Sequence, residues 1–389
     1  MKYMLTLAAG LWLLASCEQT HYGEDRGDTP RIEYVRPTTA AARDSLLVEA
    51  AMGATVALIG DGLSGASEVW FNDQKAKLNP TMITNRAVVV EVPGGMPGEV
   101  TNMITLRTKK GKEATFPFAV KIPAPRITWM TNLLAPAGAT VTLRGNYFFP
   151  DANGKIEVLF PGNVKGTVVA FDTQNIRVTI PEGALEGTIA VTSLYGTGRA
   201  EFLYGDRTGV FIDGENGAWN GWSLSDFGTE GGYDGSYIKL EGKLGSWAWP
   251  DNKIQLLYNL GGKIADIAAA DMGDYGLRFE ANCLSWSDTP YIFRFGPAGS
   301  GNDVDGTPGG QYHWKPWLVE GQNVNWVTDG WETVSLPFSE FVYNKDESVN
   351  GLSLSPSDLV ELYIMPFGAA NGESELKLWL DNLRIVKIK

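Results

Sequence analysis

The sequence predicts an all-β protein built from three consecutive β-sandwiches. Short segments of alternating apolar and polar residues occur from residue 31 to the end, and turns rich in Gly and Pro separate them. Only one short stretch, Ile264–Ala270, suggests a helical turn. A chain of 389 residues is long enough for two to four domains, each with its own core.

The N-terminus has the pattern of a bacterial lipoprotein signal. Lys2 precedes an apolar run, Leu5–Ala15, which is shorter than the roughly 20 residues of a membrane span. The run ends in Leu-Ala-Ser-Cys, which resembles a lipobox with Cys17 as the lipidated residue. The resemblance implies that residues 1–17 are a signal peptide with its lipobox, and that a lipid on Cys17 holds the protein in the outer membrane at the cell surface.

Residues 18–30 are polar and acidic, which predicts a flexible tether. Glu24 and Asp25 in this stretch resemble the surface-export signals of Bacteroidetes lipoproteins. If Cys17 carries the lipid, Cys283 is left alone, so we expect no intramolecular disulfide.

A repeat with a period of 85 residues follows the tether. The segment Gly53–Gly62 returns as Gly138–Tyr147, and each copy later contains an apolar residue followed by proline, at Val92-Pro93 and Ile180-Pro181. Copies of this length, rich in Val, Thr and Gly, predict two Ig-like sandwiches.

Both copies resemble IPT/TIG domains, through their G-x-x-V-x-L-x-G opening and later Val/Ile-Pro step. The resemblance covers residues 31–122 and 123–204, and it implies that both domains are spacers. Trp70 and Trp129 are single in their copies and are expected to pack. The joint Ile122-Pro123-Ala124-Pro125 predicts a semi-rigid stalk, whereas the next joint, at residues 204–207, lacks proline and is expected to flex more.

Residues 205–389 predict a larger jelly-roll sandwich, because at least seven strand-like segments alternate with loops of turn residues. These segments are Tyr237–Leu240, Lys253–Tyr258, Tyr275–Glu280, Tyr291–Phe295, Glu332–Leu336, Val360–Pro366 and Leu376–Leu380.

Three stretches of this domain carry a further resemblance. Leu378–Ile385 and Gly330–Phe341 resemble strands of jelly-roll carbohydrate-binding modules, and Gln311–Trp317 resembles a segment of Bacteroidetes surface glycan-binding proteins. The domain order resembles the surface glycan-binding protein B type, which occupies the SusE/SusF position of polysaccharide-utilisation systems. The resemblance implies glycan capture beside a SusC/SusD-like importer.

Tryptophan supports the same interpretation, because its flat ring stacks on the C–H face of a sugar. Ten of the thirteen tryptophans lie between Trp219 and Trp379. We expect the sugar platform at Trp286, Tyr312, Trp314 and Trp317, with Trp247 and Trp249 as the second choice. Each of these rings could equally be aromatic core.

The candidates for orienting a sugar by hydrogen bonds are Asn282, Arg294 and His313. Trp331 and Trp379 are expected to pack in the core. Trp219 and Trp222 could equally lie at the edge of the core or contact the ligand. Trp326 has no assignment. No cofactor is expected. Asn302–Gly306 has the oxygen ligands of a calcium loop but lacks the full spacing, so a solvated turn is favoured. Only analogy with other jelly rolls suggests Glu215 and Asp381 as calcium ligands.

Charge and composition exclude several functions. The net charge of −13 argues against nucleic acid and anionic membranes as partners. Two histidines and the absence of E-x-D-x-x-E, G-x-S-x-G and H-E-x-x-H argue against an enzyme. The leading hypothesis is capture of a β-glucan such as xyloglucan or mixed-linkage glucan. The alternatives are an adhesin that binds a protein and, less favoured, a surface glycoside hydrolase that uses two carboxylates.

Overall fold

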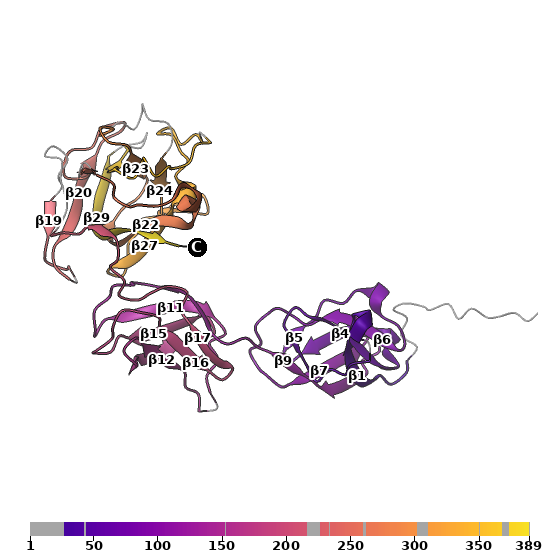
Figure 1. Ribbon diagram of the computed structural model, residues 1–389. Coiled ribbons are helices and arrows are strands. Elements are labelled where there is room, and N and C mark those ends of the chain that lie inside the picture. Colours follow the sequence, from indigo (N-terminus) through magenta and orange to yellow (C-terminus); the bar gives the residue numbers. More distant parts are fainter. Residues whose placement is uncertain are drawn as a thin grey trace, which may run out of the picture. The chain divides into compact units, whose positions relative to one another are not determined.

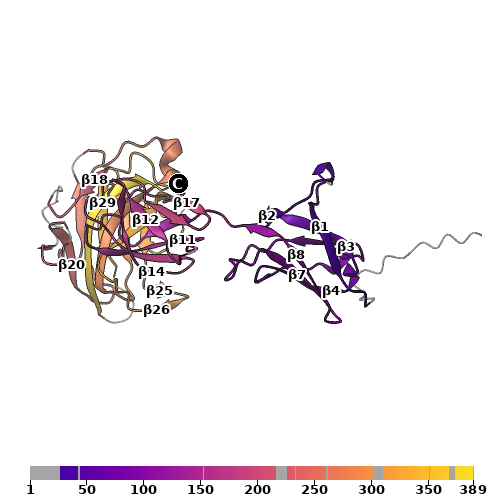
Figure 2. The same ribbon diagram turned by 90° about the horizontal axis from the view of Figure 1, so that it is seen from below.

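The computed structural model describes residues 27–388 except residues 43, 152, 216–225, 233, 260–261, 302–309, 350 and 368–372. Cys17, Trp219, Trp222 and the calcium-like stretch 302–306 therefore lie outside the described residues. The chain is all-β, as predicted, and divides into two compact units, Met1–Pro123 and Ala124–Lys389. The division falls within the predicted proline joint. Each unit is described by itself (Figures 1 and 2).

The first unit is an Ig-like sandwich around a core that runs in sequence from Ile32 to Val120. One sheet has the order β1-β3-β6 and the other β5-β4-β7-β8, while β2 and β9 form a parallel pair. Three short 3₁₀ turns are η1 (Ala40–Ala42), η2 (Leu63–Gly65) and η3 (Pro80–Met82). The strands are β1 (Arg31–Pro37), β2 (Glu49–Ala51), β3 (Thr55–Asp61), β4 (Ala66–Phe71), β5 (Gln74–Lys75), β6 (Ala87–Glu91), β7 (Met103–Thr108), β8 (Glu113–Pro117) and β9 (Ala119–Lys121).

The second unit begins with a sandwich of similar construction, around a core from Ile127 to Tyr204. Its sheets have the orders β10-β11-β15-β14 and β13-β12-β16-β17. The strands are β10 (Arg126–Met130), β11 (Thr140–Asn146), β12 (Glu157–Phe160), β13 (Val164–Lys165), β14 (Thr167–Phe171), β15 (Asn175–Thr179), β16 (Ala190–Ser193) and β17 (Gly196–Arg199).

The repeated glycine has the same structural role in both sandwiches. Gly60 and Gly145 lie opposite a register shift in the opening strand, where the two backbones come very close. A Cβ atom on Gly60 would lie 1.8 Å from the carbonyl oxygen of Arg31, and one on Gly145 would lie 1.8 Å from that of Arg126. Only glycine fits at such a bulge, which explains why the repeat includes it.

The last domain is the predicted jelly-roll sandwich, with its core between two sheets. The first sheet, β19-β20-β29-β22-β27 with β18 beside β29, lies against the second sheet, β21-β28-β23-β24 (Figure 1). The other elements are β25–β26 and the 3₁₀ turns η4 (Ala269–Asp274) and η5 (Phe338–Glu340). The strands are β18 (Val210–Ile212), β19 (Asp226–Gly228), β20 (Tyr237–Leu244), β21 (Leu256–Asn259), β22 (Tyr275–Ser285), β23 (Tyr291–Gly296), β24 (Gln311–Trp314), β25 (Leu318–Val319), β26 (Gln322–Asn323), β27 (Glu332–Pro337), β28 (Glu361–Pro366) and β29 (Ser374–Lys387).

Contacts at the second joint hold the second sandwich and the jelly roll together. The Thr333 amide donates to the carbonyl of Thr131 (2.7 Å), and the Leu133 amide donates to Thr333 Oγ1 (2.8 Å). Thr333 Oγ1 in turn donates to the buried carboxylate of Glu280 (2.9 Å), which also accepts from Arg384 (2.7 Å). These contacts lie beside the joint at residues 204–207 and would restrict the flexibility expected there from the linker alone.

Two further features bear on function. Cys283 is a buried free thiol, and burial raises its pKa to about 12, so it is a packing residue. Within the part of the chain that the structure describes, no helix has both the length and the apolar character needed to cross a membrane.

Candidate functional site

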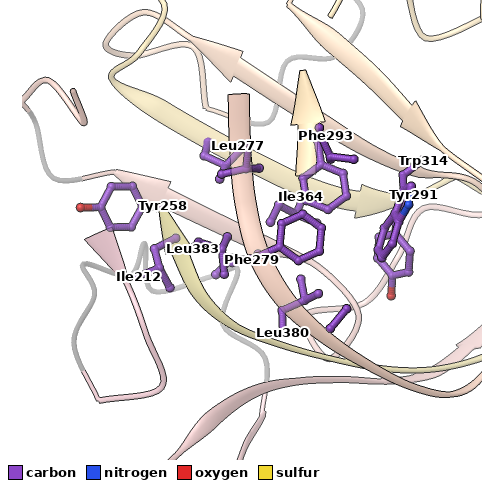
Figure 3. Close-up of a cluster of buried hydrophobic side chains, with 14 of the residues drawn as sticks. Ile212, Tyr258, Leu277, Phe279, Tyr291, Phe293, Trp314, Ile364, Leu380 and Leu383 are labelled. Carbon is purple, nitrogen blue, oxygen red and sulfur yellow. The ribbon is translucent and has the colours of Figure 1, made fainter. Parts of the chain in front are cut away.

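The first-choice platform lies in the core of the jelly roll. Trp286, Trp314 and Trp317 are 0%, 6% and 5% exposed, and Tyr312 is half-buried against the same core. The centroids of the Trp286 and Trp314 rings lie 5.0 Å apart, edge to face. In Figure 3, Trp314 lies beside Tyr291 in the cluster of buried side chains between the sheets. Buried rings have no face open to a polysaccharide, so this prediction is corrected.

The physical reason is the direction in which β24 faces. Alternation puts Tyr312 and Trp314 on one face of the strand, as predicted, but that face points at the other sheet. The indoles also have polar partners inside the protein, since Nε1 of Trp286 (2.6 Å) and of Trp317 (3.2 Å) both donate to the carbonyl of Thr289. Both rings therefore satisfy their polar atoms within the fold.

The three polar candidates do not converge on one site. Asn282 is 8% exposed and lies on β22, whereas Arg294 and His313 lie on β23 and β24 of the other sheet. Arg294 is fully buried, and its Nη1 donates to the carbonyl of Gly301 (3.2 Å). The His313 side chain is only 4% exposed. Burial lowers the pKa of His313 to about 4, with partial compensation from Glu347.

The outer face of the second sheet is covered, so it presents no open groove at this point. Glu361 of β28 is 1% exposed and accepts from the amides of Gly299 (2.7 Å) and Gly301 (2.6 Å), and from the side chain of Asn259 (2.6 Å). These bonds tie the segment after β23 across the sheet.

The tryptophans expected to pack do pack. Trp379 stacks on Tyr237 with centroids 4.6 Å apart, and its Nε1 donates to Glu241 (2.7 Å). Trp331 is 8% exposed and donates to the carbonyl of Gly231 (2.9 Å). The unassigned Trp326 contacts the buried ring of Trp286, with centroids 5.7 Å apart.

Both tryptophans of the second-choice pair are exposed. Trp247 and Trp249 are 66% and 53% exposed, and they lie on the loop that connects β20 to β21. Trp247 meets Phe367 edge to face, with ring centroids 6.2 Å apart. The ammonium of Lys345 lies 4.5 Å from the centroid of Trp249 and 4.8 Å from that of Phe367. We call these four residues the aromatic patch.

The loop that carries the two indoles is anchored to the sheet. Gln255 is 6% exposed, and its Nε2 donates to the carbonyl of Pro250 (3.0 Å) and to Oδ1 of Asn252 (3.3 Å). Tyr363 of β28 donates its hydroxyl to Gln255 Oε1, and Tyr363 is itself buried. A buried hydrogen-bond chain therefore runs from the second sheet to the loop of the aromatic patch.

The backbone at Trp247 is strained. Its φ of +55° lies in the left-handed region, which bulky side chains rarely adopt. The conformation costs roughly 1–2 kcal/mol, and an exposed indole gives little hydrophobic stabilisation in return. Such outliers gather at ligand-binding sites, where the surrounding structure enforces them.

Phe367 and Lys345 were not predicted from the sequence. Phe367 continues the alternation of Tyr363 and Met365 along β28, which is a signal that could have identified it. Nothing local marks Lys345, which reaches the rings from a turn that precedes β28 (Glu361–Pro366) in the sequence. Among the described residues, no group of three or more His, Cys, Asp or Glu side chains is arranged to hold a metal ion.

Comparison with known proteins relates parts of the chain to one family and one curated relative. Residues 204–387 match the family model of the surface glycan-binding protein B xyloglucan binding domain. An IPT/TIG domain-containing protein of Bacteroides ovatus is 28% identical over 142 residues, or 35% of this chain. The chain spans only 28% of the length of that curated relative.

One solved structure shares the fold over almost the whole chain, and a second aligns less closely. The surface glycan-binding protein PbSGBP-B of Prevotella bryantii superposes with a TM-score of 0.75 at 24% identity, over 93% of this chain and 99% of that one. SGBP-B from a complex xyloglucan utilization locus in Bacteroides uniformis has a TM-score of 0.48 at 18% identity, over 93% of this chain and 100% of that one.

The jelly roll therefore matches a glycan-binding domain family, and the whole chain shares the fold of a surface glycan-binding protein. More narrowly, the chain resembles the surface glycan-binding protein B type, with Ig-like domains before the domain that matches the family model.

Proposed function

We propose that the protein captures a polysaccharide at the cell surface without cleaving it, and that the aromatic patch is the binding site. The observation that supports this is the exposure of Trp247 and Trp249 on an anchored loop, with one of them strained. Two indoles and Phe367 offer apolar faces of the size of a pyranose ring. Affinity per site should be modest, about micromolar to millimolar, and dense display would add avidity.

The favoured ligand is a neutral β-glucan, either xyloglucan or mixed-linkage glucan. The matched family is a xyloglucan-binding domain, and one relative comes from a xyloglucan utilization locus. The net charge of −13 disfavours a polyanionic glycan such as pectin.

Affinity gel electrophoresis of residues 18–389 tests the proposal. The gels contain xyloglucan, mixed-linkage glucan, laminarin or pectin, with bovine serum albumin as a non-binding reference. We expect retardation by at least one β-glucan, and unchanged glycan chain length after prolonged incubation. Release of shorter chains would contradict capture without catalysis, and equal mobility in all gels would reject glycan binding.

The proposal extends to localisation and partners. We propose that a lipid on Cys17 holds the protein in the outer membrane, beside a SusC/SusD-like importer. The support is the lipobox-like sequence that ends at this residue. Cys17→Ser should abolish incorporation of labelled fatty acid and release the protein from the membrane fraction. Full incorporation by the variant would overturn the assignment of Cys17.

A further inference from the structure

The aromatic patch contains one cation, Lys345, which lies within 5 Å of two ring centroids. Its Nζ is 4.5 Å from the centroid of Trp249 and 4.8 Å from that of Phe367. An ammonium over an aromatic face is attracted by the ring quadrupole. The patch therefore combines stacking surfaces with a group that carries three hydrogen-bond donors.

The turn that holds Lys345 is well defined. The amide of Asn344 donates to the carbonyl of Ser348 (2.9 Å), and the amide of Glu347 donates to the carbonyl of Asn344 (3.0 Å). The Oδ1 of Asp346 accepts from the amide of Ser348 (3.0 Å). These bonds close a turn around Lys345 and fix the backbone position from which its side chain extends.

The same turn is attached to the second sheet. Glu347 forms an ion pair with Lys315, just after β24, and its Oε1 lies 3.9 Å from Nδ1 of His313. Tyr343 meets the His313 ring edge to face, with centroids 5.7 Å apart. The turn thus rests on β24, while Lys345 extends to rings that come from the β20–β21 loop and from the end of β28.

Stacking alone binds a sugar but does not orient it, because the face of an aromatic ring offers no directional bond to hydroxyl groups. The polar side chains predicted for that task, Asn282, Arg294 and His313, are buried on two different sheets. Lys345 is half-buried and lies over the exposed rings. We infer that Lys345 is a specificity-determining residue, whose ammonium donates hydrogen bonds to hydroxyl and ring oxygens of a neutral sugar stacked on Trp249.

This inference rests on the proposed function of the aromatic patch. The competing hypothesis is that Lys345 only covers the rings and competes with the sugar for them. An exposed cation–π contact changes an equilibrium by only about two- to fivefold, so the competition would be weak. Charge-assisted hydrogen bonds are about twice as strong as neutral ones, which favours a net gain from the ammonium.

The test is calorimetric titration with xyloglucan oligosaccharides and mixed-linkage glucan oligosaccharides. The variants are Lys345→Met, which replaces the ammonium-bearing chain by an unbranched apolar one, Lys345→Arg, which keeps charge and donors, and Trp249→Ala. We expect Lys345→Met to weaken binding about fivefold to tenfold without a change in melting temperature, and Lys345→Arg to recover most of the loss.

Equal or tighter binding by Lys345→Met would overturn the inference and support the competing hypothesis. If Trp249→Ala loses binding while Lys345→Met does not, only the role of Lys345 fails. If Trp249→Ala binds like the parent, or the parent binds neither glycan, the proposed function fails and the inference fails with it.

Discussion

At the scale of single residues, Trp247 combines two features that do not stabilise the folded state. Its side chain is largely exposed, and its backbone is left-handed. The edge-to-face contact with Phe367 recovers only about 0.5–1.5 kcal/mol. A glycine would adopt the same φ without strain, so folding does not explain an exposed tryptophan here, whereas a role in binding would.

Comparing Trp247→Gly with Trp247→Ala separates the two features. Both variants remove the ring, but only alanine keeps the strain of a Cβ at positive φ. We expect the glycine variant to be more stable than the alanine variant by about 1 kcal/mol, by chemical denaturation of the two proteins. Both should bind glycan at least about tenfold more weakly than the parent. Equal stability would contradict the left-handed backbone, and parental affinity would remove Trp247 from the site.

His313 was predicted to contact a sugar, but the structure buries its side chain. A histidine beside aromatic residues suggested a sugar ligand, but its ring is buried beneath the turn at residues 343–349. Neither ring nitrogen has a hydrogen-bond partner among the described residues. The folded protein holds the ring neutral, because burial lowers its pKa to about 4.

His313→Phe tests this placement through pH. In the parent, the folded pKa of about 4 lies below the unfolded value of 6.5, so the neutral ring favours folding above pH 6.5 and that contribution is lost as pH falls toward 4. The loss should be about 1–3 kcal/mol and should be absent from the variant. Unfolding titrations at pH 7, 5.5 and 4 measure it. A variant with the parental pH slope, or with impaired glycan binding at pH 7, would contradict the buried neutral ring.

At the scale of elements, strand periodicity predicted which side chains share a face but not which face is inside. In β24, Tyr312 and Trp314 do share a face, and in β23 the aromatic residues Tyr291 and Phe293 alternate with Ile292 and Arg294. Both faces of the second sheet are buried, because loops cover its outer side. Burial on both faces removes the contrast between apolar and polar positions that would indicate the inside.

The loop of the aromatic patch depends on its anchor in β28. Tyr363→Phe removes the hydroxyl bonded to Gln255 and leaves a buried amide oxygen without that donor. We expect a loss of about 1–2 kcal/mol in stability and a severalfold weaker affinity for glycan, because the anchored loop becomes looser. Hydrogen exchange across residues 245–252 measures the loosening. Unchanged exchange with weakened binding would show that Tyr363 acts in some way other than through the loop.

At the scale of the whole molecule, the sequence predicted three successive β-sandwiches but not how the second and third join. The 85-residue repeat revealed the two Ig-like copies, since Gly60 and Gly145 are required by the same bulge. The contact between Thr333 and Leu133 could not be predicted from the sequence. The two residues lie 200 positions apart, and strand periodicity does not show which distant segments come together. Within the second unit, the second sandwich is thus hydrogen-bonded to the jelly roll.

Thr333→Val should weaken the contact between the second sandwich and the jelly roll while preserving the shape of the side chain. The Leu133 amide would lose its acceptor in a mostly buried position, at a cost of about 1–3 kcal/mol. Faster hydrogen exchange at Leu133 reports the change, and Thr333→Ser, which keeps the hydroxyl, is the matched control. Parental exchange in the valine variant would show that the hydroxyl does not hold the joint.

The central claim is that the aromatic patch, and not the buried tryptophan cluster, binds the glycan. Affinity electrophoresis in xyloglucan and mixed-linkage glucan gels compares Trp247→Ala/Trp249→Ala with Trp314→Phe, each checked for parental folding by circular dichroism. We expect the double variant to migrate as it does without glycan, and Trp314→Phe to be retarded like the parent. Retardation of the double variant, together with its loss in Trp314→Phe, would contradict the account and return the site to the rings first predicted from the sequence.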